Sequence, residues 1–322
     1  MTTRGLSLVV VLALLACKHK PDDQPAVEPA GAGSSAALAK ATPLALLHQQ
    51  YKTKTIARPP ASDPAPPPEP PSKVLLTRVK YPAPVGELWA YLSLDPGDRK
   101  KHPAVVWAHG GFEFGIDDGC FAPGPPDNDQ SGAGLRTGGI IVMYPSYRGS
   151  HGAPGQYEML YGEVDDYLAA ADYLRSLPYV DPERIYFAGH STGGTLVLLA
   201  AEMTDRFRAA FAFGPADRAE RYGNANASFA TGGPDASTEW RIRAPISYLA
   251  DIKRPTIVIE GDQQPSNAAA LKLLDQAARA AKAPVTTVLV PGATHFSVIA
   301  PQTAEIARRI LADTSTAQPF RW

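Results

Sequence analysis

The pattern of apolar and polar residues from position 73 onward predicts strands that alternate with helices. Residues 73–81 and 87–94 alternate apolar and polar side chains, which is typical of two half-buried antiparallel strands joined by a turn at Pro84-Val85-Gly86. Unbroken apolar runs predict strands buried on both faces, at 104–108, 140–144, 185–188, 208–213, 256–259 and 285–290. Helical stretches lie between or after them, at 158–177, 192–201, 267–281 and 303–314. This order predicts a mostly parallel sheet covered by helices on both sides and led by an antiparallel hairpin.

The first residues have the pattern of an export signal. A short positive region, Met1-Thr-Thr-Arg4, precedes the apolar stretch 6–16, which has the length of a signal peptide and is short for a membrane span. The stretch ends in Leu14-Leu15-Ala16-Cys17, which resembles the lipobox of bacterial lipoproteins. That resemblance implies a signal peptide over 1–16 and lipidation of Cys17. An ordinary secretory signal with an incidental cysteine is the alternative.

Residues 17–72 are rich in proline and alanine and show little apolar periodicity. Such a stretch buries too little surface to offset its ordering entropy, so we predict a lipid-anchored, disordered tether with a short helix possible within 36–52. The folded domain is then expected over 73–322. A lipidated Cys17 would anchor the protein to a membrane of the cell envelope, and Lys18 after it is compatible with the outer membrane of a Gram-negative bacterium.

Composition excludes several other classes of protein. The 322-residue chain has a net charge of −1 with scattered basic residues, which does not indicate nucleic-acid binding. With two cysteines in the chain, a lipidated Cys17 leaves Cys120 without a partner, so no disulfide framework is expected. The acidic residues of the loop 111–139 lack the regular spacing of metal ligands. We therefore predict neither a metal nor a cofactor.

The stretch Gly189-His-Ser-Thr-Gly193 matches G-x-S-x-G, the turn that presents the nucleophile of serine hydrolases. It lies between a predicted buried strand and an apolar helix, as that turn requires. A serine at the apex has a strained backbone, so its neighbours must lack a Cβ. We interpret Ser191 as the nucleophile. The alternative is a glycine-rich turn that only packs a helix on the sheet.

A serine nucleophile needs a base and an orienting acid. The one histidine that follows Ser191 in the chain is His295, after the last predicted strand, and it is the predicted base. Asp262 is the first choice for the acid because it follows the strand at 256–259. Asp217 is the second choice and Glu260 the third.

Backbone N–H groups for an oxyanion hole are expected from two places. The stretch His109-Gly110-Gly111-Phe112 follows the buried strand at 104–108, where lipases and esterases have an HGG-type loop. We predict Gly111 and Thr192 as the donors, with Gly110 shaping the loop and His109 bracing it.

Residues 104–312 together resemble the catalytic domain of the prolyl oligopeptidase (S9-type) family and its dienelactone-hydrolase-like and esterase relatives. The matching stretches are His109-Gly-Gly-Phe112, Tyr144-Pro-Ser-Tyr-Arg-Gly-Ser150, Val180-Asp-Pro-Glu-Arg184, Gly189-His-Ser-Thr-Gly-Gly194 and the terminal His295. The resemblance implies an α/β-hydrolase fold with an eight-stranded type of sheet. It also implies a triad of Ser191, an acid and His295 that hydrolyses an acyl bond without a cofactor. The chain departs from the family at Gln264, the usual position of the acid.

The substrate class is less closely defined by the sequence. Peptidases of this family carry a large N-terminal propeller, and this chain has a linker before its hydrolase domain, so we favour an esterase acting on a small-molecule or peptide acyl substrate. An S9-type peptidase or aminopeptidase is the alternative within the enzyme class. A non-catalytic envelope lipoprotein is a further alternative, motivated by Gln264. The segment 219–243, with Tyr222, Phe229 and Trp240, is predicted as a small cap over the active site.

Overall fold

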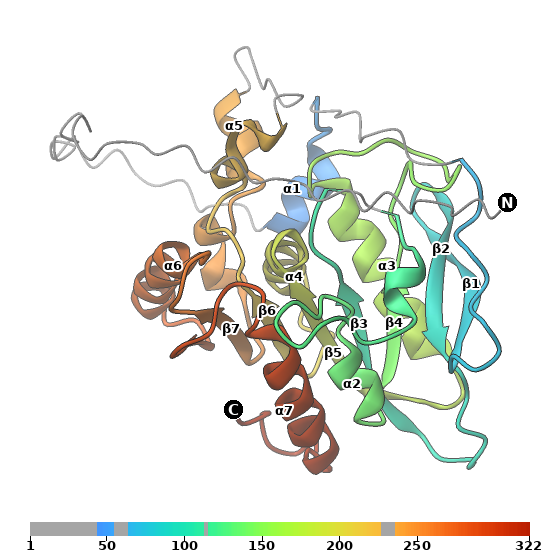
Figure 1. The fold of residues 1–322 in the computed structure, drawn as a ribbon. Helices are drawn as coiled ribbons and strands as arrows, with labels where there is room; N and C mark the ends of the chain where they lie inside the picture. Colours follow the sequence, from blue (N-terminus) through green and yellow to red (C-terminus); the bar gives the residue numbers. More distant parts are fainter. Residues whose placement is uncertain (1–43, 55–63, 113–114, 227–235) are drawn as a thin grey trace, which may run out of the picture. The chain divides into compact units, whose positions relative to one another are not determined.

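The computed structural model describes residues 44–54, 64–112, 115–226 and 236–322 (Figure 1). The chain divides into two units, 1–41 and 42–322, and the first lies outside the described residues. The predicted signal peptide and Cys17 also lie outside them. Over the described ranges, no helix is both long enough and apolar enough to cross a membrane.

An eight-stranded sheet forms the centre of the second unit, in the order β1-β2-β4-β3-β5-β6-β7-β8. Strand β2 pairs antiparallel with β1 and β4, and every other neighbouring pair is parallel. The strands are β1 (Leu76–Ala83), β2 (Gly86–Ser93), β3 (His102–Ala108), β4 (Ile141–Pro145), β5 (Val180–His190), β6 (Ala210–Phe213), β7 (Thr256–Gly261) and β8 (Val285–Val290). The predicted fold class and the antiparallel hairpin at its start are confirmed.

Helices cover both faces of this sheet (Figure 1). They are α1 (Leu44–Gln50), α2 (Ala133–Thr137), α3 (Gly162–Ser176), α4 (Thr192–Met203), α5 (Ala236–Arg241), α6 (Ala268–Ala281) and α7 (Ile299–Ala312). Short 3-10 helices are η1 (Asp118–Cys120), η2 (Ala219–Asn226), η3 (Pro245–Ser247) and η4 (Leu249–Asp251). Val106 of β3 belongs to the core under α3, α4 and α6, whereas its neighbour Val105 belongs to the core under α2 and α7. Successive residues therefore enter opposite cores, which explains the unbroken apolar runs of the central strands.

Two helices begin at other residues than the sequence pattern predicts. Helix α3 begins at Gly162 instead of 158, because Met159 and Leu160 have φ angles of 54° and 67°, which a right-handed helix cannot include. Helix α7 begins at Ile299 instead of 303, because Pro301 falls in the first turn, where a missing N–H costs no hydrogen bond.

Residues 44–54, which we name the N-terminal strap, pack on the domain although the sequence predicts a tether there. Leu44 at the start of α1 is fully buried in the core. The Tyr161 hydroxyl, just before α3, donates a hydrogen bond of 2.8 Å to the carbonyl of Tyr51. Residues before β1 also contact the sheet, since the Tyr91 hydroxyl donates to the Pro68 carbonyl over 2.7 Å. The folded unit therefore includes segments that composition alone assigns to a linker.

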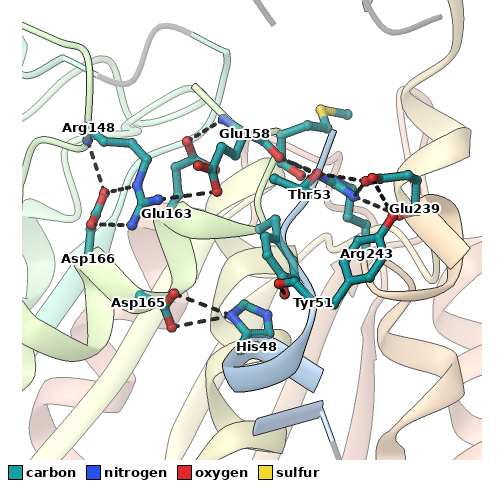
Figure 2. Close-up of polar contacts among 12 residues, drawn as sticks. His48, Tyr51, Thr53, Arg148, Glu158, Glu163, Asp165, Asp166, Glu239 and Arg243 are labelled. Atoms are coloured by element: carbon teal, nitrogen blue, oxygen red, sulfur yellow. Dashed lines mark hydrogen bonds and ion pairs between the residues drawn. The ribbon is translucent and has the colours of Figure 1, made fainter. Parts of the chain in front are cut away.

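The buried carboxylate of Glu239 on α5 holds the strap in place (Figure 2). It accepts hydrogen bonds from the Tyr51 hydroxyl, the Thr53 hydroxyl and the Lys54 backbone N–H, each over 2.7 Å. It also pairs with Arg243 at 2.7 Å. Burial alone would raise the pKa of Glu239, but the hydrogen bonds from the strap and the charge of Arg243 lower that pKa to about 2.

The guanidinium of Arg243 is fully buried and joins three segments of the chain (Figure 2). It donates to the Thr53 hydroxyl of the strap over 2.6 Å and to the Glu158 carbonyl over 2.8 Å. Its Nε donates to the carbonyl of Met159 over 2.9 Å, in the segment with positive φ angles. The guanidinium of Arg243 thus joins the strap, α5 and the segment that leads into α3.

A second buried charge cluster lies at the start of α3 (Figure 2). Arg148 binds Asp166 with two hydrogen bonds of 2.9 and 2.8 Å and approaches Glu158 at 3.2 Å. Glu163 is fully buried, and one of its oxygens accepts from the Glu158 backbone N–H over 2.8 Å. Burial raises the pKa of Glu163 to about 8, so this carboxyl keeps its proton at neutral pH.

Replacing the acceptor of the strap should destabilise the fold. We expect Glu239→Gln to lower the free energy of unfolding by about 3 kcal/mol, because it leaves the buried charge of Arg243 without its partner. Urea unfolding at pH 7 measures this. Glu87→Gln is the control, since Glu87 pairs with Lys80 at the exposed surface, and it should change little. An equally small change in both variants would contradict the importance of this contact.

The protonated Glu163 should make stability depend on pH. The folded state keeps a proton up to about pH 8, whereas an unfolded glutamate releases it near pH 4.3. The free energy of unfolding should therefore fall as the pH rises from about 5 to 8. Glu163→Gln mimics the protonated form and should remove this part of the slope, as urea unfolding at several pH values would show. Identical slopes in the wild type and the variant would refute the assignment.

Candidate active site

Ser191 lies in a strained turn between β5 and α4. Its backbone has φ 57° and ψ −116°, a conformation that side-chain-bearing residues rarely adopt. The neighbouring glycines allow the turn, because a Cβ at Gly193 would lie 2.2 Å from the Ala108 carbonyl oxygen. The Ser191 N–H donates to the Phe213 carbonyl of β6 over 2.8 Å. These close contacts are the physical reason for the glycines that the sequence places around this serine.

His295 lies in the loop between β8 and α7 and is almost fully buried. Its Nδ1 is 2.9 Å from a carboxylate oxygen of Glu260, so Nδ1 carries the proton and donates it. Its backbone N–H donates to the Pro265 carbonyl over 2.7 Å. Gly214, after β6, passes so close that a Cβ there would lie 2.4 Å from the imidazole. Backbone and ring of His295 are therefore both fixed.

Glu260 is the carboxylate that contacts His295, and it was the third choice from the sequence. It lies near the end of β7 and is fully buried. Its second oxygen accepts from the Gly261 N–H over 3.0 Å. The sequence does hold a signal for it, because residues at the carboxyl ends of parallel strands face the ligand site of such sheets. Within an apolar strand pattern, the glutamate is the one residue that burial alone does not explain.

Asp262, the first choice for the acid, has other contacts. One of its oxygens accepts from the Gly292 N–H over 2.8 Å and from the Gln263 side chain over 2.9 Å. Asp262 is exposed, and these hydrogen bonds tie the β7 loop to the loop that leads to His295. Glu260, and not Asp262, is therefore the carboxylate that is bonded to the imidazole.

Asp217, the second choice for the acid, also has hydrogen-bond partners other than His295. Its buried carboxylate accepts from Arg218 over 2.9 Å and contacts Arg221. These partners come from the same segment, so this aspartate organises the turn into η2.

The two predicted oxyanion elements lie against each other. The Thr192 hydroxyl donates to the Gly111 carbonyl over 2.5 Å, and a Cβ at Gly110 would lie 3.2 Å from that of Ser191. The Thr192 N–H belongs to the first turn of α4 and has no acceptor within that helix. Gly111 has φ 90°, and a Cβ there would meet open space. His109 hydrogen-bonds the Gly110 carbonyl over 2.9 Å, a contact that fits its predicted bracing role.

The predicted cap over 219–243 contains η2 and α5, while residues 227–235, including Phe229, lie outside the described residues. The ring of Tyr222 from η2 packs edge-on against Phe112, with centroids 5.4 Å apart. The Tyr222 hydroxyl is 2.5 Å from the Thr195 hydroxyl of α4. Tyr222 of the predicted cap therefore packs on the last residue of the loop 109–112.

The described side chains contain no group of three or more His, Cys, Asp or Glu residues that could hold a metal ion. Cys120 is buried, and burial raises the pKa of its thiol to about 12, so the thiolate needed for nucleophilic attack is scarce at neutral pH.

Comparison with known proteins relates the chain to hydrolases. Residues 131–312 match the prolyl oligopeptidase family, peptidase S9. A curated relative, dipeptidyl-peptidase 5 of Porphyromonas gingivalis, is 31% identical over an alignment of 140 residues that covers 38% of this chain and 18% of the relative. The chain thus aligns with less than a fifth of that relative.

Solved structures share the fold at low sequence identity. Dipeptidyl peptidase 4 of P. gingivalis has a TM-score of 0.59 and 17% identity, over 74% of this chain and 35% of its own. An acylaminoacyl peptidase of Pyrococcus horikoshii has a TM-score of 0.56 and 16% identity, over 76% of this chain and 43% of its own. An esterase of Pyrobaculum calidifontis has a TM-score of 0.52 and 19% identity, over 74% of this chain and 85% of its own.

The match to the family covers more than half of the chain and includes the serine turn, β7 and His295. The resemblance seen in the sequence motifs is thereby confirmed. The chain belongs to the prolyl oligopeptidase family, peptidase S9.

Proposed function

We propose that Ser191, His295 and Glu260 form the catalytic triad of this hydrolase. The observation that carries the proposal is the 2.9 Å hydrogen bond between His295 Nδ1 and the buried carboxylate of Glu260. This bond leaves Nε2 of the imidazole without a proton, which is the state a general base needs. Ser191, in its strained turn, supplies the nucleophile.

The reaction follows from these positions. His295 Nε2 takes the proton of the Ser191 hydroxyl while the oxygen attacks the substrate carbonyl. The N–H groups of Thr192 and Gly111 stabilise the oxyanion, and Glu260 stabilises the imidazolium. His295 then gives its proton to the leaving group, and water hydrolyses the acyl-enzyme by the same route. No cofactor takes part in these steps.

For the substrate we propose the amide bond of a short peptide or aminoacyl compound. The family, the curated dipeptidyl-peptidase and the acylaminoacyl peptidase fold relative support this choice over the esterase that the sequence favoured. The aromatic pair of Phe112 and Tyr222 beside the oxyanion loop would suit an apolar side chain next to the cleaved bond. An ester remains the second candidate, because the P. calidifontis esterase is matched over 85% of its length.

This arrangement removes the reason for the non-catalytic alternative. It rested on Gln264 at the usual acid position, and Glu260 supplies a buried carboxylate from β7 instead. The lipid anchor at Cys17 and a place in the cell envelope stay predictions from the sequence. Together with the hydrolase they suggest an enzyme that acts on peptides at the membrane surface.

A fluorophosphonate probe should label Ser191. We expect labelling of the wild type and none of Ser191→Ala, because the probe reacts with an activated serine hydroxyl. Aminoacyl p-nitroanilides and p-nitrophenyl esters, assayed side by side, then compare the two substrate classes by kcat/KM. Unlabelled but folded wild-type protein would refute the proposed triad. Turnover of esters alone would replace the peptide substrate by the second candidate.

Removal of the two acidic side chains should have unequal effects. We expect Glu260→Gln to lower kcat by about 10²–10⁴-fold, since the imidazole loses the partner that sets its tautomer and stabilises its charge. Asp262→Asn should stay within about threefold of the wild type, because its hydrogen bonds are structural and exposed. Steady-state kinetics with the better substrate measures both. A larger loss in Asp262→Asn would return the acid role to that residue.

A further inference from the structure

His190 precedes the nucleophile and is fully buried at the end of β5. Its Nε2 lies 3.1 Å from the backbone carbonyl oxygen of His295. A carbonyl oxygen only accepts, so the proton is on Nε2 and His190 donates. The two imidazole rings are also in contact, with centroids 4.5 Å apart. The residue bonded covalently to the nucleophile therefore also holds the predicted base.

The position of His295 depends on such contacts because the residue lies in a loop between β8 and α7. Pro265 binds its N–H, and Glu260 binds its ring, and both come from β7 or the loop after it. The hydrogen bond from His190 comes instead from the strand that carries Ser191. Of these three contacts, the one from His190 is the one that joins the loop of the base to the strand that carries the nucleophile.

We propose that His190 is a positioning residue of the hydrolase, whose donated hydrogen bond to the His295 carbonyl sets the imidazole of His295 against the Ser191 hydroxyl. The inference rests on the proposed triad and adds a residue to its support. His190 does not touch the substrate. It acts through the backbone of the base.

The surroundings of His190 keep the donor in place during the reaction. Burial, and then the neighbouring charge of His295, lower the pKa of His190 to about 3. The titratable groups that face it are the His295 ring and, behind that ring, Glu260. His190 thus stays neutral when His295 becomes an imidazolium, and no second positive charge forms beside it. On its other side, Gly110 approaches so closely that a Cβ there would lie 3.0 Å from Nδ1.

A role in packing alone and a role in positioning differ in what two substitutions do. His190→Phe keeps an aromatic ring against His295 and Phe296 but removes the donor. His190→Gln loses the ring but keeps a side-chain N–H that can reach the carbonyl. A packing role predicts a larger loss in the glutamine variant, and a positioning role predicts a larger loss in the phenylalanine variant.

The test compares both variants with the wild type in the full chain. We expect His190→Phe to lower kcat and the rate of fluorophosphonate labelling by about 10–100-fold, with KM within about twofold, as a small displacement of a catalytic group does. His190→Gln should stay within about fivefold of the wild-type kcat. Circular dichroism and thermal unfolding check that both variants fold. Equal rates in folded His190→Phe and wild type would overturn the proposal, as would a larger loss in His190→Gln.

Imidazole NMR separates this inference from the proposed function. In protein with ¹⁵N-labelled histidine, His190 should show a proton on Nε2 at every pH from 5 to 8. The downfield Nδ1 proton of His295, bonded to Glu260, should be lost in His190→Phe and retained in His190→Gln. These signals report the position of His295 even if the wild type fails to react with the probe. Failure to react would contradict the proposed triad and not the positioning role. A proton on Nδ1 of His190, or an unchanged His295 signal in His190→Phe, would overturn the positioning role.

Discussion

The contact between the first turn of α4 and the ends of β3 and β6 is the constraint on which the site depends. A Cβ at Gly193 would overlap the Ala108 carbonyl of β3, and a Cβ at Gly194 would lie 2.5 Å from the Phe213 carbonyl of β6. Because the first turn of α4 lies so close to β6, the Ser191 N–H donates a hydrogen bond to the same Phe213 carbonyl. The sheet therefore imposes the backbone conformation of Ser191, and the strain of that conformation is balanced by contacts from the parallel strands.

The remaining parts of the site come from strands that flank this point. The loop 109–112 follows β3, Gly214 against the imidazole follows β6, and Glu260 is the residue before the last of β7. Because parallel strands end at one edge of the sheet, residues far apart in the sequence meet there. The loop that carries His295 is the exception, since it needs hydrogen bonds from its neighbours to hold a residue that no strand or helix positions.

The strands and the serine turn could be predicted because each depends on local pattern. Alternation, apolar runs and glycine spacing all reflect sterics within a few residues, and the sheet follows those patterns. The acid could not be predicted in the same way, because Glu260 and Asp262 are two residues apart, and strand alternation places residues at that spacing on the same face. Their different partners, His295 and Gly292, lie some 30 residues away in the sequence. The start of α3 was missed for a similar reason, since nothing local marks positive φ angles at Met159 and Leu160.

The strap shows where composition misleads about the limits of a domain. A protein expressed from residue 73, as the proline content suggests, would lack the hydroxyls and the backbone N–H that Glu239 binds, and the core would lose Leu44. The space left by Leu44, and a Glu239 carboxylate that has lost these three donors, would lie beside α5 and the entry to α3. Poor solubility of such a shortened protein would then say nothing about the hydrolase. An expression boundary ahead of residue 44 keeps the domain whole.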